Sequence, residues 1–205
     1  MRPCQTNLRP FGSARPRAGS KGGTTYIIWS GFATYFTPGH YEDHWICEYW
    51  RADEQRWAMV DAQLDEFQCK VLHIGFDPCD VPPGRFLPGG KAWNLCRTGQ
   101  ADPDLFGIFD MHGLWFIRGD LVRDLASLNR MELLPWDCWG IIDVKDEGLS
   151  AEDMALLDHV AALTLADNAA FPELRSIYEN DPRLRVPPVI RSYSSGGVRT
   201  VELSI

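Results

Sequence analysis

The chain has 205 residues, of which 45% are hydrophobic and 12% aromatic, which is enough material for one folded domain with a sizeable core. Its formal net charge of −8 argues against binding to nucleic acid or to an anionic membrane surface. No apolar run approaches the roughly 18 residues of a membrane span, and the N-terminus lacks the apolar core of a secretory signal. We therefore expect a cytoplasmic protein.

The first segment, residues 1–23, differs in composition from everything that follows. It holds five basic residues and no acidic one, with many Pro, Gly and Ser residues and no helical or alternating apolar period. Such a composition is typical of a disordered or loosely attached tail, although a targeting peptide or a polyanion-binding arm would share it. The remainder, residues 24–205, has no linker that would divide it and is predicted to form a single domain.

Three strands are predicted at the start of this domain. Residues 24–36 (TTYIIWSGFATYF) are rich in β-branched and aromatic residues and end at the turn Thr37-Pro38-Gly39. Residues 44–50 (HWICEYW) and 56–60 (RWAMV) have the same character, and the polar loop RADEQ separates them. This pattern predicts an antiparallel hairpin.

Helical spacing of apolar residues follows further along the chain, and the sequence SAED at Ser150 has the pattern of a capping box. Residues 81–90 are a turn-rich loop, and residues 198–205 are either a last strand or a loose tail. The predicted fold class is α+β, with a small antiparallel sheet, helices packed against it and a helical C-terminal extension. The helices are predicted at residues 91–97, 114–128, 154–165 and 171–178.

Metal and cofactor sites are not predicted. His40, Glu42, Asp43 and His44 offer ligand atoms, but Pro38-Gly39 and the following strand prevent the helix that would align the two histidines, so we expect a solvated loop here. The eight tryptophans fall within strand and helix patterns, which favours core packing over a stacking surface. Six cysteines without a CxxC pair indicate reduced thiols: Cys4, Cys47, Cys69, Cys79, Cys96 and Cys138.

His44 and Asp61 are the candidate catalytic residues. One begins the first strand of the predicted hairpin and the other follows the second strand, so both lie at the same end of the hairpin. A carboxylate that accepts the proton of one ring nitrogen fixes the histidine tautomer and leaves the other nitrogen to activate a nucleophile. The alternative is a surface histidine beside a strand-end aspartate, which is a common arrangement.

The order DHWICEYW, polar loop, RWAMVDAQLD resembles the His and Asp strands of the transglutaminase-like domain, a branch of the papain-like thiol enzymes. The stretches GFATYF, GGKAW and GLWFIRGDLVRDLASLNRMELLPWDCWG are similar to bacterial transglutaminase-like proteins of unassigned substrate, so the resemblance covers roughly residues 31–140. It implies a papain-like core, His44 as the base and Asp61 as its orienting acid. The implied reaction is hydrolysis or acyl transfer on a peptide or small amide substrate.

The same resemblance implies a nucleophilic cysteine at the start of a core helix upstream of His44. Cys4 stands upstream, but Pro3, Pro10 and Pro16 prevent a helix after it. We expect that the chain lacks its N-terminal cysteine helix, or that its first residues come from an altered reading frame, and that it has no thiol-dependent amide chemistry as written. The rival interpretation is a non-catalytic module that binds a peptide or amide.

Overall fold

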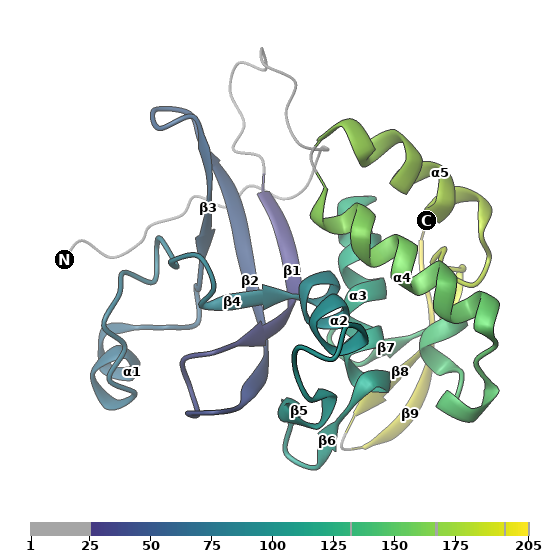
Figure 1. The fold of residues 1–205 in the computed structure, drawn as a ribbon, viewed down its shortest axis with the longest axis horizontal. Coiled ribbons are helices and arrows are strands. Elements are labelled where there is room, and N and C mark those ends of the chain that lie inside the picture. The colour runs from purple at the N-terminus through teal and green to yellow at the C-terminus, as the bar shows by residue number, and fades with distance from the viewer. Residues whose placement is uncertain (1–25, 132, 167, 195, 205) are drawn as a thin grey trace.

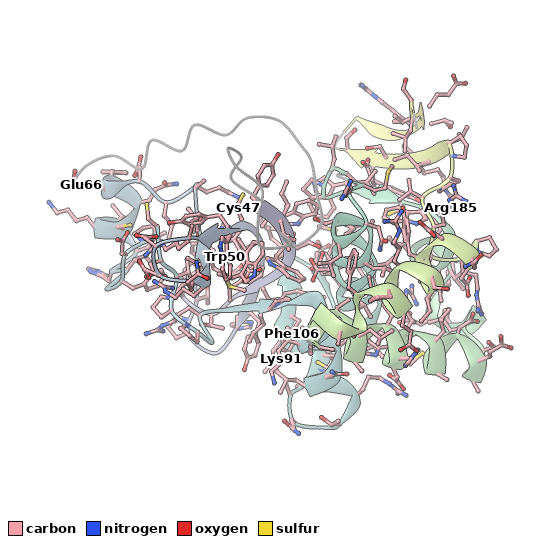
Figure 2. The ribbon with its side chains drawn as sticks, turned by 90° about the horizontal axis from the view of Figure 1, so that it is seen from above. Cys47, Trp50, Glu66, Lys91, Phe106 and Arg185 are labelled. Carbon is pink, nitrogen blue, oxygen red and sulfur yellow. The ribbon has the colours of Figure 1, made fainter. Side chains whose placement is uncertain are left out.

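The computed structural model describes residues 26–131, 133–166, 168–194 and 196–204, and within these ranges it has the predicted α+β class (Figure 1). A six-stranded sheet occupies one half of the molecule, and four of the α-helices with a three-stranded sheet occupy the other. Figure 2 shows the same division from above, with Glu66 at one end and Arg185 at the other. The predicted tail and Cys4 lie outside the described residues.

The predicted hairpin is confirmed. Strand β2 (Tyr41–Arg51) pairs antiparallel with β1 (Tyr26–Ala33) on one side and with β3 (Arg56–Val60) on the other. Strand β2 begins three residues earlier than the sequence indicated, because its first residues pair with the end of β1. The prediction of a solvated loop around the His40–His44 cluster is therefore wrong for the residues from Tyr41 onward.

The main sheet has six strands and is mixed, whereas the sequence predicted a small antiparallel sheet. Strand β4 (Phe86–Pro88) pairs antiparallel with β1, within a segment predicted to be a loop. Strand β5 (Phe106–Ile108) runs parallel to the start of β2 and forms a short hairpin with β6 (Met111–His112). Strands of two or three residues are too short for an alternating pattern to reveal them.

One edge of β2 is shared by two strands. Strand β5 pairs with residues 41–42 and strand β3 with residues 47–51. Among the described strands, none pairs with residues 43–46 on this edge. The gap between β3 and β5 places Asp43 and His44 at an interruption of the sheet, one on each face because side chains alternate along a strand.

The predicted helices are all present: α2 (Gly89–Arg97), α3 (Leu114–Leu128), α4 (Ala151–Leu165) and α5 (Phe171–Asn180). The predicted capping box at the start of α4 is confirmed, because the Ser150 side chain accepts a hydrogen bond from Asp153 N and the Asp153 side chain accepts one from Ser150 N. A further short helix, α1 (Glu66–Val71), was not predicted and lies at the far end of the main sheet (Figure 1). Short 3₁₀ turns occur at Pro103–Leu105 (η1), Gly140–Asp143 (η2), Asp146–Gly148 (η3) and Asn168–Ala170 (η4).

The C-terminal part is more than a helical extension. Strands β8 (Val189–Ser194) and β9 (Gly197–Glu202) form an antiparallel hairpin, and β7 (Asp137–Cys138) pairs with β8. The predicted last strand is β9, and its partners were not predicted. This second sheet lies beside α3, because Arg123 of α3 donates a hydrogen bond to Asp137 O of β7. Cys138 of β7 and Tyr193 of β8 line a cavity with residues of α3.

Apolar side chains fill the space between the main sheet and the helices. Phe106 is labelled in Figure 2 between these two layers, and its ring contacts Phe32 edge to face at a centroid distance of 5.1 Å. A buried carboxylate joins the layers: Asp124 of α3 accepts hydrogen bonds from Ser30 N of β1 and Gly89 N of α2, both at 2.8 Å. The largest fully buried side chains of the core include Trp93, Trp139, Phe32, Phe106, Ile117 and Leu121.

Candidate active site

The two candidate catalytic residues meet in the structure. His44 Nε2 lies 2.7 Å from Asp61 Oδ2, and the two side chains are buried, with exposed fractions of 8% for His44 and 1% for Asp61. The predicted contact between His44 and Asp61 is therefore confirmed. Their catalytic role stays a prediction.

The interrupted edge of β2 explains how this contact forms. Val60, the last residue of β3, pairs with Cys47, and Asp61 follows it at the gap. The β2–β3 pairing ends at Val60, and the backbone N–H of Asp61 donates a hydrogen bond to Pro78 O instead, at 2.8 Å. Because no strand fills the gap among the described residues, the Asp61 side chain can reach His44 from the edge of the sheet.

Tyr35 is a third member of the site that the sequence analysis missed. It follows β1, and its hydroxyl donates a 2.6 Å hydrogen bond to Asp61 Oδ2, the same oxygen that contacts His44. Gln63 N donates to the other carboxylate oxygen at 3.0 Å. Both oxygens of Asp61 thus have partners, and the carboxylate is held in one orientation.

Burial and hydrogen bonding act in opposite directions on Asp61. Burial alone would raise the pKa of Asp61, but the hydrogen bonds and charge of His44, with the hydrogen bonds from Tyr35 and Gln63, outweigh it and bring the pKa below its ordinary value. For Tyr35, burial and the neighbouring Asp61 both raise the pKa of the phenol. At neutral pH, Asp61 is therefore a carboxylate and Tyr35 a neutral hydrogen-bond donor.

The second nitrogen of His44 is left available. Within the described ranges, no hydrogen-bond partner contacts Nδ1. The imidazole lies edge to face against the rings of Phe36 and Tyr35, at centroid distances of 4.9 Å and 6.1 Å. The aromatic rings and Asp61 fix the imidazole, so Nδ1 is the atom that can accept or donate a proton.

Neither Cys47 nor Cys69 provides an activated thiol for this histidine. Cys47 is three residues from His44 on β2, so its side chain projects from the opposite face of the strand. Burial, and then the nearby carboxylates of Asp61, Asp65 and Asp77, raise the pKa of the Cys69 thiol, which disfavours the thiolate. Cys4, the cysteine upstream of His44, lies outside the described residues.

Comparisons of the chain with protein-family models, with curated proteins and with solved structures found no match. In the part of the chain that the structure describes, no helix is both long and apolar enough to cross a membrane. The same residues contain no group of three or more His, Cys, Asp or Glu side chains placed to hold a metal ion. The chemistry of the site is therefore argued from its own geometry.

Proposed function

We propose that this protein is a transglutaminase-like protein of papain-like architecture, in which His44 and Asp61 form the base half of a thiol-dependent acyl-transfer site. The proposed setting is the cytoplasm and the proposed substrate a peptide or small amide. The supporting observation is the 2.7 Å contact of His44 Nε2 with a buried carboxylate, with Nδ1 left unengaged among the described residues. This division of the two ring nitrogens is what a general base requires.

With a thiol at Nδ1, the chemistry would proceed by covalent catalysis. Nδ1 takes the thiol proton, the thiolate adds to the amide carbonyl carbon, and the C–N bond breaks as the leaving amine receives that proton from the imidazolium. The resulting thioester is then attacked by water or by a second amine, and the thiol is regenerated. Asp61 stabilises the imidazolium, and Tyr35 keeps Asp61 oriented toward His44.

We further propose that the chain as written performs no acyl transfer by itself. A histidine and carboxylate without an attacking group cannot form the acyl intermediate, and what remains is small beside the several orders of magnitude lost with the nucleophile. The raised pKa of the Cys69 thiol supports this proposal. The raised pKa of this thiol also favours the second candidate function, a non-catalytic module that binds a peptide or amide at the His44–Asp61 site.

An added thiol tests the base half independently of the missing nucleophile. The full chain is mixed with 4-nitrophenyl acetate and 2-mercaptoethanol. The rate of acyl transfer to the thiol is measured from the nitrophenol that is released. We expect His44→Gln to lower the protein-dependent rate about tenfold or more, since general-base catalysis contributes on the order of 10² or more in rate. The control is His159→Gln, because the His159 side chain is exposed and contacts the exposed Glu173.

An unchanged rate in folded His44→Gln protein would overturn the base assignment. Turnover of an amide substrate without added thiol, abolished by Cys4→Ser in a folded protein, would overturn the proposed inactivity. Saturable binding of a peptide amide, with no His44-dependent acyl transfer, would favour the binding module instead.

A further inference from the structure

A cavity of about 580 Å³ lies on the opposite side of β2 from the His44–Asp61 contact. Its volume is within the range of small-molecule sites. Asp43 lines it, whereas His44 and Asp61 do not. The apolar part of its wall includes Met111, Trp115, Phe116, Pro135, Trp136 and Ile142.

The floor of this cavity is charged and buried. Helix α3 contributes Arg118, Asp120 and Arg123, and β2 contributes Asp43. The exposed fractions of Arg118 and Asp120 are only 2% and 1%. Charged groups that are removed from water to this extent require hydrogen-bond partners. A donor or acceptor that has no partner within the protein indicates what kind of ligand group would complete the site.

The two guanidinium groups have acceptors inside the protein. Arg118 donates to Asp146 Oδ1 at 2.8 Å and to Val144 O at 2.5 Å. Arg123 donates to Asp137 O at 3.1 Å and to Asp120 Oδ1 at 3.3 Å. Neither arginine lacks a counter-group, so the floor does not call for an anion.

Two buried carboxylate oxygens in the floor of the cavity have no hydrogen-bond donor among the described residues. Among the described residues, no donor contacts Asp120 Oδ2 or Asp43 Oδ1, although both oxygens are buried. One buried donor, Arg118 Nε, also has no acceptor. Acids outnumber bases along the whole lining: Asp43, Asp120, Asp143, Asp146 and Glu147 against Arg118, Arg123 and Lys145.

We propose that this cavity binds a small organic cation, a primary amine attached to an aromatic or apolar body. The ammonium group donates to Asp43 Oδ1 and Asp120 Oδ2, which are the acceptors without donors. The body packs against Trp115 and Trp136, whose indole faces also attract a cation.

The protonation of the two acids determines how binding of the amine should depend on pH. Burial raises the pKa of Asp43 to about 6; Arg123 and His44 oppose the rise, and Glu42 adds to it. Burial, and then the charge of Asp43, raise the pKa of Asp120 well above its ordinary value, which Arg123 opposes. A cation between the two carboxylates favours their ionised forms, so its binding releases a proton and strengthens as pH rises through about 6.

Titration calorimetry with three matched probes tests the charge of the ligand. The probes are phenethylamine, 2-phenylethanol and phenylacetate, which share a ring and a two-carbon chain and differ in charge. We expect saturable binding of the amine to the full chain at pH 7, about tenfold weaker binding at pH 5, and binding of the alcohol and the acid at least tenfold weaker than that of the amine. Because Trp115 and Trp136 line the cavity, the amine should also change tryptophan fluorescence.

Two variants locate the site. Asp43→Asn should weaken amine binding about tenfold or more, and Trp115→Ala should weaken all three probes, since Trp115 is partly exposed and its removal spares the core. Asp104→Asn, at an exposed acid outside the cavity, is the control. Absent binding, equal binding of amine and alcohol, or wild-type affinity in folded Asp43→Asn protein would each overturn the proposal. Amine binding is measured without thiol or ester, so its outcome is independent of that of the acyl-transfer experiment.

Discussion

Tyr35 stabilises the candidate active site through one hydroxyl group. We expect Tyr35→Phe to lower the free energy of unfolding by about 1 kcal/mol, because Asp61 Oδ2 keeps His44 but loses the 2.6 Å bond from the phenol. Urea denaturation at pH 7 measures the change. The control is Tyr193→Phe, whose exposed hydroxyl lies 3.5 Å from Asp143, and an equal loss in both variants would contradict the role given to Tyr35.

Asp43 should make stability depend on pH. Its pKa in the folded protein is about 6, above the unfolded value near 4, so its favourable contribution is complete below about pH 4 and is lost as pH rises through 6. We expect Asp43→Asn to remove this loss and to be about 3 kcal/mol more stable than the parent chain at pH 8, at about 1.4 kcal/mol per pKa unit. Unfolding midpoints measured from pH 4 to pH 8 would show it, and parallel curves for the two proteins would contradict it.

The sequence revealed some members of these sites and concealed others. The meeting of His44 and Asp61 was predictable because a hairpin brings the start of one strand to the end of the next. Tyr35 was not, because a tyrosine just after a strand is as consistent with packing as with a hydrogen bond to Asp61. The charged floor of the cavity was also missed: Asp120 and Arg123 lie in a helix whose apolar spacing predicted only packing, and burial of a charge leaves no periodic signal.

Helix α2 begins with two glycines that permit close packing between elements. A Cβ atom at Gly89 would lie 2.4 Å from Leu121 N and 2.6 Å from Asp120 C, and these are backbone atoms of α3 that cannot rotate away. We expect Gly89→Ala to cost about 3 kcal/mol of stability by overpacking. Gly75→Ala is the control, because nothing lies within 4 Å of its added Cβ, and thermal denaturation should show little change or a slight gain.

At the level of elements, length separates what the sequence predicted from what it did not. The helices from α2 to α5 each offer at least two turns of spaced apolar residues or a capping signal, as at Ser150. Strands β4 to β7 have two or three residues each, and their pairing depends on distant partners such as β1 and β2. Tertiary contacts, not local preference, form such strands.

In the whole molecule, Asp124 of α3 links the main sheet to the helices. Its carboxylate accepts hydrogen bonds from the backbone N–H groups of Ser30 in β1 and Gly89 in α2. Asp124→Asn would turn an amide N–H₂ toward one of these backbone donors, at a cost of about 3 kcal/mol. Both layers should then melt together at a lower temperature. Far-ultraviolet and near-ultraviolet circular dichroism should give coincident transitions, with Asp104→Asn as the control. Separate transitions would mean that the layers fold independently.

Side chains of β2 alternate between the two faces of the sheet, and this limits where the chain tolerates insertions and deletions. Asp43 and His44 are neighbours that serve opposite faces, so a shift of β2 by one residue would send the histidine toward α3 and the aspartate toward Tyr35. A length change inside residues 41–46 would therefore damage both sites at once. The exposed turn at residues 37–40 can absorb the same change, because it follows Tyr35 and Phe36 and precedes β2. Length variation among descendants of this sequence should accumulate in that turn and spare the strand.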